Sequence, residues 1–199
     1  MNPAPLRRLQ VMGPWHRLHR AESETMAGLL SIPERDAVNR RLSLRPRNQP
    51  PAWVPPRADG EGSRFCEPLG PGALYLGNEL PTCLAEVAHH HARHCAASLG
   101  TPPGSRAVLR HLIFQVSGTL ADATAAPRNG LHDPSTYVPS WAYGRLARAE
   151  GLQGVHYRSV RRRGGRCLAI FEERAVRFLR SELGAVILEW DGATSRRIA

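Results

Sequence analysis

The sequence predicts an α+β fold with a compact mixed sheet flanked by helices. The run VLRHLIFQV at residues 108–116 is rich in β-branched and apolar residues, which is typical of a strand. Apolar residues at helical spacing follow Pro81 and predict a helix there. Further strand-like and helix-like segments follow in an irregular order, which favours α+β over a regular βαβ winding.

Residues 1–57 are expected to form an extension ahead of a main domain at residues 58–199. One or two short helices are expected within residues 1–45, because Ser23 suits an N-cap and Pro33 suits a first helical turn. Residues 46–56 contain five Pro and must be extended. This segment either wraps the core surface with Trp53 as an anchor or acts as a flexible linker.

The helix after Pro81 follows a short extended run at residues 73–77, and Pro fits its first turn. Glu86 falls on the flank of the helix's apolar face, where a carboxylate can reach a cleft. The apolar stripe consists of Leu80, Cys83, Leu84 and Val87.

The remaining elements are predicted from residues that interrupt helices and strands and from the residue types between them. Residues 117–134 are expected to be loop, since Gly, Pro and Asp interrupt them. A helix is expected from about Ser140 to Glu150, capped by Ser140 and stopped by Gly151. Strands are expected near residues 155–157, 167–171 and 185–190, with a short helical piece at 175–183.

The composition is that of a globular protein with an excess of positive charge. The 199 residues fit one domain with a real core, and 42% of them are hydrophobic. The net charge of +10 raises the hypothesis of nucleic-acid binding. All 27 basic residues are Arg, alongside abundant Ala, Gly and Pro, which indicates GC-rich codons rather than a functional demand. An acidic partner or a phosphate-bearing substrate would use the same charge.

Location can also be predicted from the sequence. No apolar run is long enough to span a bilayer, and the first twenty residues hold four Arg and no apolar segment, so no secretory signal is expected. The four Cys form no C-x-x-C pair, and reduced thiols in a cytoplasmic protein are expected.

A set of motifs between about residues 58 and 172 carries a family resemblance. Arg64, Tyr75 and Glu86 are spaced eleven residues apart. The motifs are Arg64-Phe65, Gly72-x-Leu74-Tyr75, Leu84-Ala85-Glu86-Val87, then Gly154-x-x-Tyr157-x-Ser159-x-Arg161, the pair Gly164-Gly165 and the apolar run at 167–171. Together they resemble the signature of the RES domain family, which is named for an Arg, a Glu and a Ser.

The resemblance implies a fold like that of the ADP-ribosyltransferases and a toxin of a type II toxin–antitoxin pair that degrades NAD+ in the bacterial cytoplasm. Its implied partner is an Xre-type antitoxin that covers the active site, with DNA contacted only indirectly through the antitoxin. No cofactor is implied beyond NAD+ as the substrate, with water or inorganic phosphate as the acceptor. Association into a homodimer stays open.

The implied chemistry is cleavage of the bond between nicotinamide and ribose. Nicotinamide leaves as a neutral base from a cationic precursor, so the site must chiefly place an anion near the ribose as oxocarbenium character develops. The resemblance assigns this role to Glu86, whose alternative is a surface ion pair. Arg64 is assigned to the diphosphate or the ribose hydroxyls, with an ordinary surface Arg as the alternative.

Further residues are assigned to substrate binding by the resemblance. Tyr75 is expected to stack on nicotinamide, and Ser159 to bind the ribose or the amide, unless both are merely strand residues. Arg45 and Arg47 both lie where the family has a second Arg. Tyr137 lies where relatives have an aromatic residue.

The run RSVRRRGGR at residues 158–166 has an anion-binding composition, because guanidinium groups and Gly-exposed N–H groups favour anions. Arg161 is its best candidate to face the cleft; the alternative is an exposed turn with solvated Arg side chains.

A histidine-rich segment follows Glu86. His90 and His94 are four residues apart on one helical face, which is ligand-like spacing for zinc. No second His/Cys cluster supplies a further ligand, so a polar helix face is favoured and no metal is expected.

Three other functions stay open. One is transfer of ADP-ribose to a protein target, and another is a secreted NAD-degrading effector. The third is a non-catalytic nucleic-acid or protein-binding module, which predicts salt-dependent DNA binding.

Overall fold

The fold is taken from a computed structural model that describes residues 6–20, 61–98, 100–126 and 130–198. It is α+β, as predicted, with a seven-stranded mixed sheet and two α-helices in the described residues. In chain order the elements are β1 (Arg8–Arg20), β2 (Leu74–Gly77), α3 (Leu80–Ala97), β3 (Arg106–Asp122), α4 (Val138–Ala149), β4 (Gly154–Arg158), β5 (Arg166–Ile170), the 3-10 turn η1 (Glu173–Ala175), β6 (Val176–Trp190) and β7 (Ser195–Arg197).

Five of the strands close into a ring. β1 pairs antiparallel with β3 along its whole length and touches β2 at the single pair His16–Gly77. β2 pairs with β5, β5 with β4, and β4 returns to β3 as a parallel neighbour. β6 and β7 extend the sheet beyond β3. Because the ring joins segments far apart in the sequence, it brings side chains from both ends of the chain to one place.

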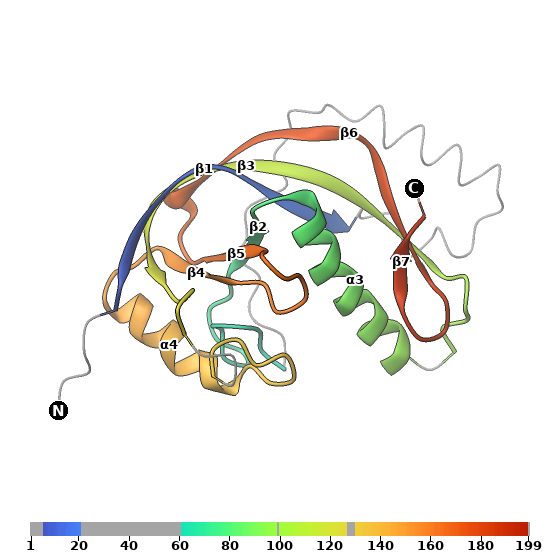
Figure 1. Ribbon diagram of the computed structural model, residues 1–199, viewed down its shortest axis with the longest axis horizontal. Coiled ribbons are helices and arrows are strands. Elements are labelled where there is room, and N and C mark those ends of the chain that lie inside the picture. The colour runs from blue at the N-terminus through green and yellow to red at the C-terminus, as the bar shows by residue number, and fades with distance from the viewer. Residues whose placement is uncertain (1–5, 21–60, 99, 127–129, 199) are drawn as a thin grey trace.

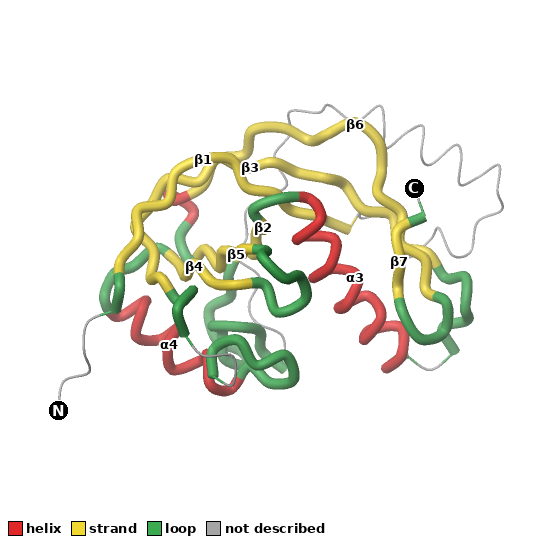
Figure 2. The backbone as a smooth tube through the Cα atoms, in the orientation of Figure 1, coloured by secondary structure: helices red, strands yellow, loops and turns green. Residues whose placement is uncertain are grey.

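The long strands and the helices lie on opposite sides of the molecule. Figure 1 shows β1, β3 and β6 arching over α3 and α4, with the short strands β2, β4 and β5 between them. Figure 2 shows the loops gathered between the two helices. The concave side of the sheet therefore faces both helices and these loops.

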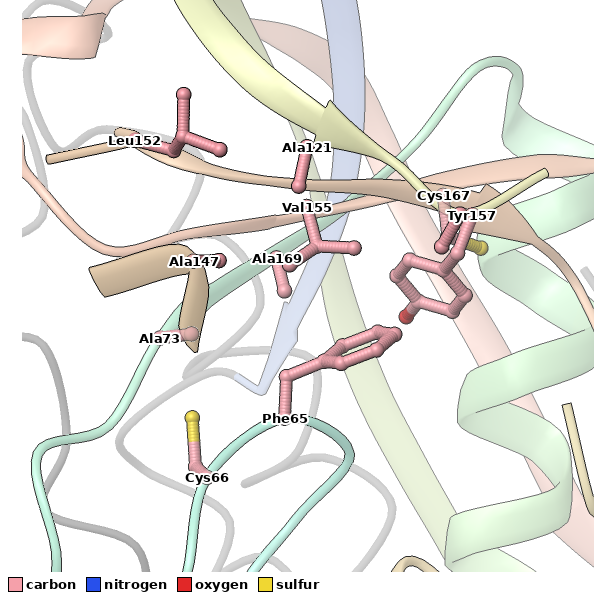
Figure 3. Close-up of a cluster of buried hydrophobic side chains, with 11 residues drawn as sticks. Phe65, Cys66, Ala73, Ala121, Ala147, Leu152, Val155, Tyr157, Cys167 and Ala169 are labelled. Atoms are coloured by element: carbon pink, nitrogen blue, oxygen red, sulfur yellow. The ribbon is translucent and has the colours of Figure 1, made fainter. Parts of the chain in front are cut away.

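The core consists of three apolar clusters. The first joins α4 to β4 and β5, and in Figure 3 the ring of Phe65 points toward Tyr157, 5.0 Å away between ring centres. The second lies among the strands, and the third packs α3 against β1, β3 and β6. The apolar stripe predicted on the helix contributes to this third cluster, through Cys83 with Leu80, Leu84 and Val87.

The helix boundaries are close to those predicted, but one cap differs. α3 begins at Leu80 with Pro81 in its first turn. α4 has Tyr137 as its N-cap rather than Ser140, so the predicted cap is wrong. Ser140 lies inside the first turn, where its hydroxyl donates to the Tyr137 carbonyl and accepts from the Phe65 amide. α4 ends before Gly151, whose φ of +68° suits glycine, as predicted.

Several strand assignments differ from the sequence-based predictions. Residues 8–20 form β1, within the part of the chain where one or two short helices were expected. Residues 117–122 belong to β3 instead of a loop, and residues 176–183 begin β6 instead of a helix. In each case pairing with a distant strand decides the conformation. The helices expected after Ser23 and Pro33 and the segment at 46–56 with Trp53 lie outside the described residues. The division at residue 57 stays a prediction, although β1 is part of the same sheet.

Two further predictions concerned the oxidation state of the cysteines and membrane-spanning segments. Cys66, Cys83, Cys95 and Cys167 are all buried free thiols. In the described part of the chain, neither helix combines the length and the apolar character needed to cross a bilayer.

Candidate functional site

A pocket of about 940 Å³ opens between α3, β1 and β2, and the loops before β2, before α4 and after β4 contribute to its lining. This volume is at the upper end of the range for small-molecule sites. Its charged lining residues are Arg17, Glu61, Arg64, Glu86, Arg93 and Arg161. The pocket therefore combines four guanidinium groups with two carboxylates, a balance suited to a phosphate-bearing cationic ligand.

Glu86 presents its carboxylate to this pocket from the middle of α3. The Ser159 hydroxyl donates a hydrogen bond of 2.6 Å to its Oε1. The substrate contact expected of Ser159 stays a prediction, and in the structure its hydroxyl is bonded to Glu86. Glu86 and Ser159, two residues of the predicted motifs that are 73 residues apart in sequence, are thus joined by one hydrogen bond.

The loop after β4 holds Ser159 in place. Its Oγ accepts bonds from the amides of Arg161 and Arg162, and its own amide donates to the Gly165 carbonyl. Gly165 packs so closely that a Cβ there would lie 2.8 Å from the Thr82 hydroxyl. Gly165 therefore lets this loop approach the N-terminal turns of α3, while Gly164 adopts a φ of +81° that suits glycine.

Tyr75 lies in the pocket wall, but its hydroxyl faces protein groups. It donates to the Arg64 carbonyl and lies 2.9 Å from the Ser63 Oγ. Burial, reinforced by the Cys66 thiol, raises the pKa of Tyr75 well above its usual range. The phenol thus stays neutral and fixes the backbone at Arg64.

The Arg64 side chain is buried against the loop that leads into α4. Its Nη1 and Nη2 donate to the carbonyls of Leu131 and Asp133, at 2.5 and 2.8 Å. The guanidinium lies over the Tyr137 ring, 5.1 Å from its centre. The structure thus brings together Arg64 and Tyr137, both predicted site residues, and both line the pocket.

The structure describes only one of the other Arg residues that were predicted for the site. Arg161 lines the pocket and donates to the Pro134 carbonyl at 2.5 Å. Arg45 and Arg47 lie outside the described residues. Arg17, which was not among the predicted site residues, lines the pocket from β1, and its Nη1 lies 3.4 Å from the Tyr75 carbonyl. Burial lowers the pKa of Arg17.

Neutral groups form the wall behind Glu86. Burial raises the pKa of Cys83 to about 12 and that of Cys167 well above its usual range. The pKa of Tyr157 is raised too, first by burial and then by Cys167 and Glu86. Tyr157 was expected only as part of the motif, and its place near the end of β4, just before the loop that holds Ser159, brings it into the pocket wall.

The histidine-rich segment of α3 contributes two side chains to the lining of the pocket. His90 and His94 line it. Within residues 6–20, 61–98, 100–126 and 130–198, no group of three His, Cys, Asp or Glu side chains is arranged to hold a metal ion. His91 instead lies 2.7 Å from the Ser195 Oγ, which ties α3 to β7.

Comparison with known proteins decides the family. Residues 39–191 match the RES domain, which is more than half of the chain. The chain belongs to the RES domain family. No curated protein matches this RES domain in sequence.

A solved structure shares the fold of this RES domain. It is the toxin chain in the crystal structure of the M. tuberculosis MbcT-MbcA toxin–antitoxin complex, with a TM-score of 0.60 and 17% identity. The alignment covers 88% of this chain and 85% of that chain. The seven-stranded mixed sheet with two helices is thus an architecture found in a known toxin.

Proposed function

We propose that this RES domain cleaves the nicotinamide–ribose bond of NAD+, with water or phosphate as the acceptor. The observation that carries the proposal is the Glu86 carboxylate, oriented by Ser159 at 2.6 Å, at the wall of a pocket with four Arg side chains. A fixed anion beside the ribose stabilises the cationic transition state more than it stabilises the ground state. The leaving nicotinamide is neutral, so no proton donor is required.

The pocket residues have distinct roles in this proposal. Ser159 keeps the carboxylate in one orientation, and its hydroxyl proton stays with Ser159. Arg17 and Arg161 neutralise the diphosphate, while the second Arg expected at position 45 or 47 stays a prediction. Arg64 places Tyr137 at the pocket, because its guanidinium lies over the Tyr137 ring and is bonded to the loop before it. Tyr137 then offers a ring face to a planar heterocycle.

The proposed biological role is that of a toxin in the bacterial cytoplasm, controlled by a protein partner. Its support is the shared fold with MbcT, which was crystallised in a toxin–antitoxin complex. A partner that covered this pocket would present acidic groups to its Arg side chains. Contact with DNA would then come through the partner.

The deciding experiment measures nicotinamide release from NAD+ by purified protein, with and without inorganic phosphate, beside a Glu86→Gln variant. We expect release by the wild type and a loss of at least about a hundredfold in Glu86→Gln, the scale of removing one electrostatic group. Dependence on phosphate would identify the acceptor. A folded wild type that releases no nicotinamide under either condition would refute the proposal, and transfer of label to protein would favour ADP-ribosyl transfer.

A further inference from the structure

Thr82 is a polar side chain buried beside the candidate site, and the roles proposed above do not use it. None of its surface is exposed. It lies on α3 four residues before Glu86, so the two side chains project from one face of the helix. Burying a hydroxyl costs free energy unless the group is hydrogen-bonded. The partners of the Thr82 hydroxyl therefore indicate what this residue holds in place.

The Thr82 hydroxyl is bonded to the end of β2. It donates a hydrogen bond of 2.9 Å to the Asn78 Oδ1, and the same oxygen accepts the backbone amide of Arg166 at 2.9 Å. The backbone amide of Asn78 donates to the Arg166 carbonyl, also at 2.9 Å. Asn78 thus continues the ladder between β2 and β5 beyond the pair Gly77–Cys167. Thr82 thereby fixes the side chain that holds the start of β5, where the loop after β4 ends.

The Thr82 side chain also packs against that loop, which comprises residues 159–165. A Cβ at Gly165 would lie 2.8 Å from the Thr82 Oγ1 and 3.1 Å from the Ser159 Cβ, so the Gly165 backbone lies against both side chains. The Ser159 amide donates to the Gly165 carbonyl at 3.0 Å. The loop and α3 therefore meet at two levels, one helical turn apart, with Gly165 on Thr82 and Ser159 on Glu86.

A second connection between the loop and α3 lies at the surface. The Arg162 Nη1 lies 3.2 Å from the Glu79 Oε1, and both side chains are at least one-third exposed. Water and salt screen such a pair, so it contributes little to holding the loop. Glu79 is also a more distant acceptor for the Thr82 hydroxyl than Asn78, at 3.4 Å. The buried contacts of Thr82 are therefore the stronger connection.

We propose that Thr82 is a positioning residue for the cleavage reaction and holds the 159–165 loop where Ser159 can donate to Glu86. This inference rests on the proposed function and deepens it, because it adds a residue that acts on the carboxylate from outside the pocket. Thr82 itself does not line the pocket. Its effect passes through Ser159, so loss of its hydroxyl should change turnover rather than substrate binding.

The first test measures nicotinamide release from NAD+ by Thr82→Val, which removes the hydroxyl and keeps the branched shape. The kcat should fall about tenfold while the KM changes less than about twofold. Thr82→Ser restores the hydroxyl and should recover most of the turnover. Thr119→Val is the matched control, because the Thr119 hydroxyl donates a bond of similar length, 2.8 Å, to the Gln10 Oε1, and neither residue lines the pocket. This control should turn over as the wild type does.

The second test combines Thr82→Val with Ser159→Ala. If Thr82 acts through Ser159, the double variant should lose no more turnover than Ser159→Ala alone. Losses that multiply would show that Thr82 acts by another route and would overturn the inference. A Thr82→Val enzyme with the wild-type kcat, or one in which only the KM rises, would overturn it as well.

The third test does not depend on catalysis. The amides of Ser159, Arg161 and Arg162 are all hydrogen-bonded within the loop, so hydrogen–deuterium exchange reports how firmly the loop is held. These amides should exchange about tenfold faster in Thr82→Val than in the wild type and in Thr119→Val, with all three proteins shown to be folded by thermal unfolding. Equal exchange rates would overturn the inference. If exchange follows the prediction but the wild type releases no nicotinamide, the proposed function fails and the role of Thr82 in holding the loop stands.

Discussion

Arg148 donates a hydrogen bond of 3.0 Å from its Nη1 to the carbonyl of Phe65, a residue held at a φ of +66°. A left-handed backbone at an aromatic residue costs about 1–2 kcal/mol. The cost is offset by the surroundings: Ser140 accepts the Phe65 amide, and the ring is buried against Tyr157. Phe65 thus belongs to the core cluster, while the neighbouring Arg64 lines the pocket.

Replacing Arg148 by Ala should lower the free energy of unfolding by about 3 kcal/mol, because its guanidinium also binds the carbonyls of Pro71 and Gly72. Urea denaturation measures the change. Arg145→Ala on the same helix is the control, because its exposed pair with Glu67 contributes at most about 1 kcal/mol. Equal losses in the two variants would contradict the assigned role of Arg148.

Gly144→Ala should destabilise the protein, although Ala is the better helix former by about 1 kcal/mol. A Cβ at Gly144 would lie 2.2 Å from the Phe65 carbonyl oxygen, a backbone atom that Arg148 holds in place. We expect a loss of roughly 1–3 kcal/mol, the usual range for overpacking. Thermal unfolding provides the measurement, and a stabilised variant would show that α4 can move away from the loop.

Ser159→Ala should reduce turnover of NAD+ about tenfold to a hundredfold with a smaller effect on KM, because Glu86 loses the donor that orients it. Steady-state kinetics separates the two parameters. Ser135→Ala, an exposed serine in another loop, is the control and should be silent. An effect on KM alone would return Ser159 to the substrate-binding role.

Stability should fall as the pH rises above about 9. Burial raises the pKa of Cys83 and of Tyr143 to about 12, and burial also raises the pKa values of Tyr75 and Tyr157 well above their usual range. The unfolded chain releases these protons near pH 9–10 while the folded chain keeps them, so deprotonation favours the unfolded state.

Each such group removes at most about 1.4 kcal/mol per pH unit above its unfolded pKa. Urea denaturation at pH 8.0 and 10.5 tests this expectation, and Tyr75→Phe should show a smaller decrease than the wild type. A stability that is constant over this interval would mean that these side chains ionise freely in the folded protein.

The sequence predicted the elements whose signals are local. β2, α3, α4 and the short strands β4 and β5 each carry their own apolar spacing and stop residues. β1 was missed because Gly13-Pro14 interrupts it, and Pro lacks the amide that a central strand requires. The alternation of Leu9, Val11 and Trp15 was a usable signal, and these side chains do share one cluster.

The start of β6 was missed for a similar reason. Residues 176–183 contain apolar and charged residues that fit a short helix as well as a strand. Their pairing with β3 passes two irregularities in register, which local sequence cannot reveal.

The sequence indicated most of the residues that line the candidate site, but not the hydrogen bonds between them. Motif positions placed Arg64, Tyr75, Glu86, Tyr137, Ser159 and Arg161 in one region, and five of them line the pocket. The bond from Ser159 to Glu86 and the carbonyl partners of Arg64 depend on how loops fold back. Arg17 and Arg148 are two of 27 Arg residues, and nothing in their immediate sequence distinguishes them.

The ring of strands also determines when the pocket can exist during synthesis. Its wall runs from Arg17, on the first strand, to Cys167, on the strand that pairs with β2. A nascent chain on the ribosome therefore has no complete wall until most of its length has been translated and has left the exit tunnel. A translation product that ends between residues 87 and 158 would carry Glu86 without Ser159, and its carboxylate would lack the hydroxyl that donates to it in the full chain.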